Sequence, residues 1–254
     1  MGFTALMYHS LSDGRHPDSL YPKYTTTLGK FREHLAALHE GGYRICSVRE
    51  IMEAHDAGQT GLHHMCVLTF DDGHRSALDF ADAMSEAGVR ATFFLTSGYC
   101  RERADFLKED EIRELAQRGF DFGTHGATHR PLRALPADEL RAELTDSKKW
   151  LEDTLSAPVD TMSLPAGQGG NAVRETAFAS GYRLIGNSYE AGNRRLVLPG
   201  ELNRFAVLKH HETDEVLRLA SASPAYIWRR RMRAAALWLP KKLTRSSHRT
   251  RPEA

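Results

Sequence analysis

The chain has 254 residues, of which 41% are hydrophobic and 26% charged, a composition typical of a folded globular protein with a substantial core. Its formal net charge of +1 excludes a protein that recognises its partner by overall charge alone. Three scattered cysteines, Cys46, Cys66 and Cys100, exclude a disulfide framework and a thiolate metal site, and they indicate a reducing compartment. There is no signal-peptide pattern and no apolar run close to the ~20 residues of a membrane span. We therefore expect a cytoplasmic protein.

Strand-like and helix-like segments alternate along the chain. In order, we expect strand 3–8, helix 28–41, strand 43–48, helix 49–57, strand 65–70, helix 76–87, strand 91–96, helix 108–117, strand 120–123, helix 136–155, strand 161–164, helix 172–180, and strands 182–186 and 204–208. This order predicts an α/β fold of parallel strands, with reactive residues at the C-terminal ends of the strands.

The most informative motif is TFDDG at residues 69–73, which places two adjacent carboxylates where a buried strand ends. Side chains alternate along a strand, but a turn at Gly73 can bring both Asp71 and Asp72 to the rim of one pocket. Two carboxylates held close together are costly unless a cation lies between them or a proton is shared. The pair therefore predicts a metal site.

His125 and His129, in the segment GTHGATH at residues 123–129, are the candidate partners of Asp72. Their spacing would place both imidazoles on the same side of one helical turn, where they can bind a single divalent ion. Two histidines and one carboxylate leave positions open for water and substrate, as catalytic metal sites do. Zn²⁺ is the metal we expect first, and Co²⁺ and Ni²⁺ also suit this ligand set.

Three motifs, in order, resemble those of the polysaccharide deacetylase family, the NodB-homology or carbohydrate esterase 4 group. They are TFDDG at 69–73, HGATH at 125–129 and SLPAG at 163–167. The segments LMYHS at 6–10 and YTTTLGKFREHL at 24–35 resemble the family too, so the resemblance covers about residues 5–220. It is closest to the branch found with bacterial exopolysaccharide biosynthesis. It implies a distorted, incomplete (β/α) barrel that hydrolyses N-acetyl groups from amino sugars.

The residue types fit metal-dependent amide hydrolysis. A divalent ion on Asp72, His125 and His129 would polarise an amide carbonyl and acidify a water molecule. Asp71 beside it would be the general base that takes the proton of that water.

By resemblance, a backbone N–H in the loop of Pro165, Ala166 and Gly167 would help to hold the oxyanion. Family members often carry an arginine two residues before this proline, where it orients the base, but this chain has Ser163. The exopolysaccharide-associated branch also tends to lack that arginine, so its absence does not imply inactivity. Arg204 could replace it, or could be a structural or surface arginine.

The leaving amine needs a general acid, and the family uses a histidine near its last strand. His210 and His211 follow the strand expected at 204–208, and alternation sends one of them inward and the other outward. If Phe205 faces inward, then His211, an even number of residues further on, faces inward too. This favours His211 as the general acid. His9 could line the mouth of the pocket or be structural.

The charge is unevenly distributed. Residues 222–254 hold nine Lys or Arg and one acidic residue, a charge of +8, whereas the rest of the chain has 25 basic and 32 acidic residues, a charge of −7. The segment 225–239 combines tryptophans and arginines in a helical pattern. It could lie on an anionic membrane surface through residues 225–245, which would suit a lipid-linked saccharide, or it could pack against the barrel.

We expect a polysaccharide-deacetylase-like catalytic domain at 1–220 and a basic amphipathic C-terminal helix and tail at 221–254. Three functions stay open: removal of acetyl from an N-acetylated saccharide, deformylation of a lipid-linked amino sugar, and silent carbohydrate binding. Asp71 argues against the last, because a relic has no need of a base. Nucleic acid is not an expected partner, since the body is acidic and lacks a recognition motif. The expected location is the cytoplasm, with the inner membrane as the surface that the C-terminal helix would contact.

Overall fold

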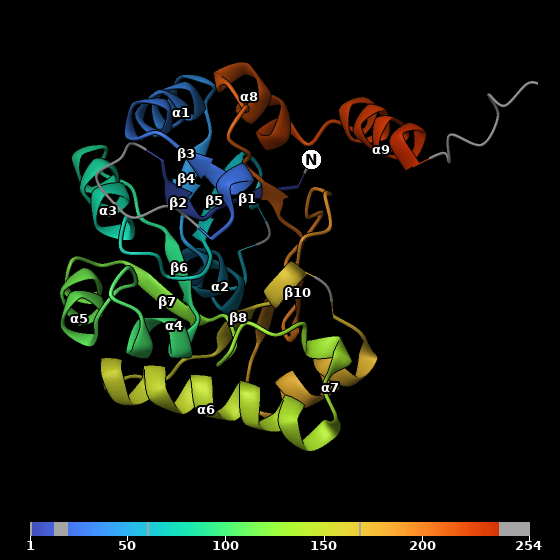
Figure 1. Ribbon diagram of the computed structural model, residues 1–254. Helices are drawn as coiled ribbons and strands as arrows, with labels where there is room; N and C mark the ends of the chain where they lie inside the picture. The colour runs from blue at the N-terminus through green and yellow to red at the C-terminus, as the bar shows by residue number, and fades with distance from the viewer. Residues whose placement is uncertain (1, 13–19, 60, 168, 239–254) are drawn as a thin grey trace, which may run out of the picture. The chain divides into compact units, whose positions relative to one another are not determined.

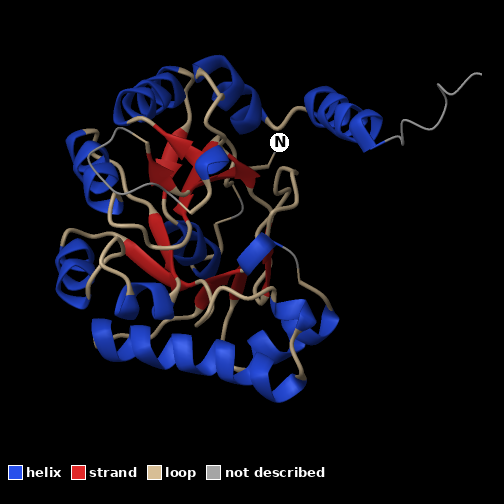
Figure 2. Cartoon of the chain, viewed as in Figure 1, coloured by secondary structure: helices blue, strands red, loops and turns tan. Residues whose placement is uncertain are grey.

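The structure is a computed structural model, and it divides the chain into two compact units, Met1–Ala222 and Ser223–Ala254. The residues that it describes are 2–12, 20–59, 61–167 and 169–238. Figures 1 and 2 show that the first unit is built of parallel strands surrounded by helices. This is the α/β class that the alternating pattern predicts.

A nine-stranded parallel sheet forms the centre of the first unit. Its order is β10 (Gly200–Leu202), β9 (Leu184–Gly186), β8 (Thr161–Ser163), β7 (Asp121–Thr124), β6 (Thr92–Leu95), β5 (Met65–Phe70), β1 (Thr4–Tyr8) and β11 (Phe205–Ala206), with β4 (Arg44–Cys46) pairing with the first half of β5. Within the described residues the order does not close from β10 back to β11. The sheet is therefore a curled, incomplete barrel, as expected.

Helices cover the outside of this sheet (Figure 1). They are α1 (Leu28–Glu40), α2 (Val48–Asp56), α3 (Ala77–Glu86), α4 (Ser97–Glu102), α5 (Glu109–Gln117), α6 (Ala137–Leu155), α7 (Asn171–Ala179) and α8 (Thr213–Ser221). The expected helices are present to within about two residues. The pattern missed α4, α8, β10 and the small pair formed by β2 (Ser10–Leu11) and β3 (Thr25–Thr26). Most of these elements are too short to show a period.

The pairing of β1 with β5 sets the direction of the side chains that follow them. Tyr8 lies opposite Phe70, and both rings pack outward among Phe31 of α1 and Phe80 of α3, with centroids 4.7–6.3 Å apart. Since alternate side chains face opposite sides of a sheet, the next residue after each strand faces the interior of the barrel. The carboxyl end of β5 thus carries its functional group inward.

The described part of the second unit is helix α9 (Pro224–Trp238), close to the helix expected at 225–239. Trp228 and Met232, four residues apart, are 63% and 51% exposed. Residues 239–245 of the expected membrane-contacting segment lie outside the described residues. None of the helices in the described part of the chain has both the length and the hydropathy required to cross a bilayer.

Candidate active site

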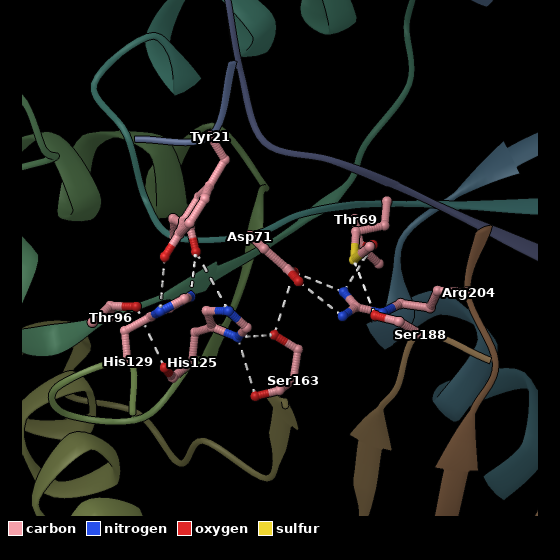
Figure 3. A network of polar contacts seen from close by, with 11 residues as sticks. Tyr21, Thr69, Asp71, Thr96, His125, His129, Ser163, Ser188 and Arg204 are labelled. Carbon is pink, nitrogen blue, oxygen red and sulfur yellow. Dashed lines mark hydrogen bonds and ion pairs between the residues drawn. The ribbon is translucent and has the colours of Figure 1, made fainter. Parts of the chain in front are cut away.

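Side chains from several strands meet near the carboxyl end of β5, and Figure 3 labels Asp71, His125, His129, Ser163 and Arg204 among them. They are His9 after β1, Asp71 and Asp72 after β5, His125 and His129 after β7, Ser163 at the end of β8, and Arg204 just before β11. The topology therefore gathers residues that are up to about two hundred positions apart.

Asp72, His125 and His129 form a cluster that could hold a metal ion, with their ligand atoms within 4.8 Å of one another. The Nε2 atoms of His125 and His129 lie 3.4 and 3.2 Å from Asp72 Oδ1. That oxygen is buried and has no hydrogen-bond partner among the described residues. A buried oxygen of this kind, facing two imidazole nitrogens, fits a divalent cation.

The two histidines lie in a loop, so the expectation of a helical turn is wrong. The φ angles of Gly126 and His129 are 73° and 63°, which no α-helix allows. Glu143 of α6 holds the loop instead, because its carboxylate accepts the N–H groups of Ala127 at 2.7 Å and Thr128 at 2.9 Å. The spacing of the histidines is right, but their convergence comes from this loop.

Each of the two imidazoles has its Nδ1 beside a hydroxyl group. His125 Nδ1 lies 2.5 Å from Ser163 Oγ and 3.1 Å from the Ser163 carbonyl oxygen, and His129 Nδ1 lies 3.3 Å from Tyr21 Oη. Both contacts leave Nε2 directed at Asp72. Burial lowers the pKa of His125 to about 4, although the neighbouring aspartates oppose the shift. His125 is therefore neutral near pH 7, as a metal ligand must be.

Asp71 forms a buried, bidentate ion pair with Arg204. The two nitrogen–oxygen distances are 2.7 and 2.8 Å, and the side chains are 3% and 0% exposed. Burial alone would raise the pKa of Asp71, but the Arg204 guanidinium and His125 hold it well below its usual range. Ser163 Oγ donates to the same carboxylate at 3.3 Å. Arg204 thus holds the carboxylate that is predicted to be the base, and its interpretation as a surface residue is wrong.

Arg204 reaches Asp71 by crossing the interior of the barrel. Its Nε donates to the carbonyl oxygen of Asn187 at 3.0 Å, and its guanidinium lies over the ring of Phe94, 5.4 Å from the centroid. Gly186 leaves room for it, because a Cβ there would lie 3.0 Å from Arg204 Nε. Only the curl of the sheet brings these groups together, so no local sequence signal identified the pair.

One of the two candidate histidines lies outward and the other inward, as expected. His210 is exposed, and His211 is buried with its Nδ1 accepting the N–H of Leu208 at 3.2 Å. The premise behind the preference for His211 is wrong, however, because Arg204 points into the barrel and Phe205 next to it therefore faces the other way. The acid role of either histidine stays a prediction.

His9 lies beside the aspartates. It follows Tyr8, which pairs with Phe70, so His9 is the counterpart of Asp71 across the two strands. Burial lowers the pKa of His9, while the charges of Asp72 and Asp71 raise it. Its Nδ1 is buried and has no hydrogen-bond partner among the described residues. This nitrogen beside the two aspartates makes His9 a candidate for a chemical role.

The loop from residue 165 to 167 offers one backbone donor. Pro165 has no N–H, and the N–H of Gly167 donates to the Leu164 carbonyl oxygen at 2.7 Å, which leaves that of Ala166. Ala166 has a φ of 58°, so the turn departs from ordinary helical geometry. Gly167 is required by close packing, because a Cβ there would lie 2.0 Å from Ser188 Oγ.

Known proteins are similar to this chain in sequence. Residues 58–185 match the model of the family described as polysaccharide deacetylase. The YxkH protein of Bacillus subtilis (strain 168) is 30% identical over 186 residues, which are 70% of this chain and 62% of that protein. The poly-beta-1,6-N-acetyl-D-glucosamine N-deacetylase of Escherichia coli (strain K12) is 37% identical over 75 residues, 30% of this chain and 11% of the enzyme. The chain spans less than two thirds of the length of these two relatives.

Solved structures share the fold. The Streptococcus pyogenes deacetylase PplD in complex with acetate superposes with a TM-score of 0.74 at 21% identity, covering 87% of this chain and 98% of that one. IcaB from Ammonifex degensii superposes with a TM-score of 0.73 at 21% identity, covering 87% and 96%. The matched range, residues 58–185, includes the aspartate and histidine motifs of this chain, and the fold is the incomplete barrel that these motifs predict. The chain belongs to the polysaccharide deacetylase family.

Proposed function

We propose that this protein is a metal-dependent hydrolase that removes N-acetyl groups from an amino-sugar-containing saccharide during assembly of a bacterial exopolysaccharide or cell-envelope polysaccharide. One observation carries the proposal: the buried Oδ1 of Asp72 lies 3.4 and 3.2 Å from two imidazole nitrogens, next to a second carboxylate held by Arg204. The similarity to a poly-beta-1,6-N-acetyl-D-glucosamine N-deacetylase supports the substrate class.

Asp72, His125 and His129 would hold a divalent ion, which would polarise the amide carbonyl and acidify water. Asp71 accepts the proton of the attacking water, and Arg204 keeps its carboxylate ionised and oriented. Asp71 is a weak base, because its pKa is held low. It can therefore take a proton only from a water molecule that has already been acidified. The Ala166 N–H would donate to the oxygen that gains charge as the amide carbonyl becomes tetrahedral.

His9 is the residue that we assign to protonation of the leaving amine. It lies across from Asp71, and its buried Nδ1 lacks a partner among the described residues. The comparison of His9→Gln with His211→Gln tests this assignment. We expect the first to lower kcat by about 10²-fold or more and the second to change it much less. The reverse order would return the role to His211.

Acetate release tests the function. The protein is stripped with a chelator and assayed on N-acetylated oligosaccharides with and without Zn²⁺ or Co²⁺. We expect acetate only with metal, no metal retention in Asp72→Ala, and retained metal with a rate lowered about 10²-fold or more in Asp71→Asn. Formate from an N-formylated sugar in place of acetate would identify a deformylase. Saccharide binding without either product would identify a silent binding domain.

For its location we propose the cytoplasm, with helix α9 resting on the anionic surface of the inner membrane. The exposed Trp228 and Met232 lie one helical turn apart, and residues 222–254 carry a charge of +8. Apolar groups that enter the interface and cations that face anionic lipid are both favourable there. Co-sedimentation with vesicles tests the proposal. Binding to phosphatidylglycerol vesicles that is lost in Trp228→Ser would support it, and equal binding to neutral vesicles, or none, would refute it.

A further inference from the structure

A short turn near the start of the chain touches two functional imidazoles that come from different strands. It consists of Tyr21 and the 3₁₀ turn Pro22–Tyr24. Tyr21 Oη lies 3.3 Å from His129 Nδ1, and the two rings are 5.6 Å apart (Figure 3). Tyr24 stacks on His9 with a centroid distance of 4.6 Å and an interplanar angle of 18°. One turn thus contacts a proposed metal ligand and the proposed acid.

The turn is closed on itself and attached to neighbouring segments. The N–H of Tyr24 donates to the carbonyl oxygen of Tyr21 at 2.9 Å and closes the turn. The N–H of Lys209, after β11, donates to the carbonyl oxygen of Lys23 at 2.9 Å and attaches it. The pairing of β3, which directly follows Tyr24, with β2 holds its other side. Because the backbone is anchored, the two tyrosine rings have defined positions over the imidazoles.

Tyr21 and Tyr99 both pack against the ring of His129. Tyr99 of α4 stacks on it with centroids 5.6 Å apart at 24°, and Tyr21 lies at 32°. The Tyr21 hydroxyl can accept a hydrogen bond from the N–H at Nδ1 of His129. The unprotonated Nε2 of that ring is then the ligand atom, and it lies 3.2 Å from Asp72 Oδ1. A hydrogen bond to the remote nitrogen of a ligating histidine fixes its tautomer and ring orientation.

We infer that residues 21–24 are a positioning element for the site, in which Tyr21 orients His129 toward the metal and Tyr24 fixes the ring plane of His9. The inference rests on the proposed metal site and on the proposed role of His9. Neither tyrosine touches the reacting atoms in this arrangement, so both act through the imidazoles. Substitution of Tyr21 should therefore change metal affinity, whereas substitution of Tyr24 should change turnover.

Substitution of Tyr21 by Phe tests the first half, because it removes the hydroxyl and keeps the ring. The Kd for Co²⁺, measured by competition with a chromogenic chelator, should rise about 10- to 100-fold, and the visible absorption of bound Co²⁺ should change. The control is Tyr43→Phe, the same change before β4, which should leave both unaltered. Tyr21→Leu, which also removes the ring, shows whether packing alone matters. A Tyr21→Phe protein with wild-type affinity and spectrum would overturn this half.

Substitution of Tyr24 by Leu tests the second half. We expect Co²⁺ affinity within about twofold of wild type and a kcat for acetate release lowered about tenfold, with KM little changed. Loss of metal, or an unchanged kcat, would overturn the assignment of Tyr24. A wild-type protein that binds no Co²⁺ would refute the proposed metal site itself and the inference with it. A wild-type protein that binds Co²⁺ but releases no acetate would refute the proposed activity and the role of Tyr24, and would leave the Tyr21 result interpretable.

Discussion

Replacement of Arg204 by Met should damage stability and catalysis together. The change removes two charge-assisted hydrogen bonds, of 2.7 and 2.8 Å, from a carboxylate that is only 3% exposed. Breaking one side of such a buried pair costs about 3–5 kcal/mol. Without the guanidinium, burial raises the pKa of Asp71 and favours the protonated acid, which cannot serve as a base. We expect a rate lowered by about 10²-fold or more.

Urea denaturation and acetate release measure the two effects. Arg183→Met is the matched control, because Arg183 pairs with Asp56 at the surface, where an ion pair contributes about 0–1 kcal/mol. The double variant of Arg204→Met with Asp71→Asn should recover part of the lost stability, since no unpaired charge remains. An Arg204→Met protein that unfolds within about 1 kcal/mol of wild type and keeps its rate near pH 7 would refute the argument.

The sign of the pH dependence follows from the same pair. The folded pKa of Asp71 lies below the unfolded value of roughly 3.9. Its stabilising contribution is therefore complete above that unfolded value and is lost as the pH falls toward the folded pKa. In Arg204→Met the folded pKa rises, so the acidic limb of the rate profile should move to higher pH.

Three further predictions concern the surroundings of the site. His34 is buried, and its pKa is lowered to about 4, mainly by that burial. The free energy of unfolding should therefore fall by up to roughly 3 kcal/mol as the pH drops from 6.5 to 4. Denaturation at each pH should show a smaller dependence of this free energy on pH in His34→Asn, and an unchanged dependence would contradict the argument. Gly186→Ala should lower the stability by about 1–3 kcal/mol and slow acetate release, because the new Cβ meets Arg204. Gly170→Ala is the control, since Gly170 is exposed and a Cβ there meets nothing. Equal melting temperatures of the Gly186→Ala and Gly170→Ala proteins would refute the steric argument. Glu143→Leu leaves two N–H groups of the histidine loop unpaired. The affinity for Co²⁺, measured by competition with a chelator, should therefore fall about tenfold or more. Wild-type affinity would contradict the role of the Glu143 carboxylate.

The sequence predicts what depends on local pattern and misses what depends on the curl of the sheet. The strand before Asp71 and the Asp72 and histidine motifs can be read from hydrophobic runs and spacing. Arg204 could not be assigned, because its partner lies 133 positions away, after a strand two places along the curved sheet. The preference for His211 was argued from an inward-facing Phe205, and that premise is wrong for the same reason.

Tyr21 and Tyr24 illustrate a second limit. Both stand in a polar stretch that carries no periodic signal, and their importance comes from the pairing of β2 with β3, two strands of two residues each. Strands of this length fall below what alternation can reveal. Loop residues that position functional groups are thus visible only in three dimensions.

The ion pair of Arg204 joins parts of the chain that are made at different times. Asp71 belongs to the first third of the chain, and the carbonyl group of Asn187 and Arg204 itself belong to its last third. The matched family core at residues 58–185 contains the aspartate and histidine motifs but neither Arg204 nor His9. During synthesis, a chain that has not yet reached residue 204 can collect all three candidate metal ligands, while its catalytic carboxylate is still without a cation. The carboxylate of the proposed base is therefore paired only when the two ends of the barrel have met, and competence for the proposed hydrolysis becomes a late event of folding.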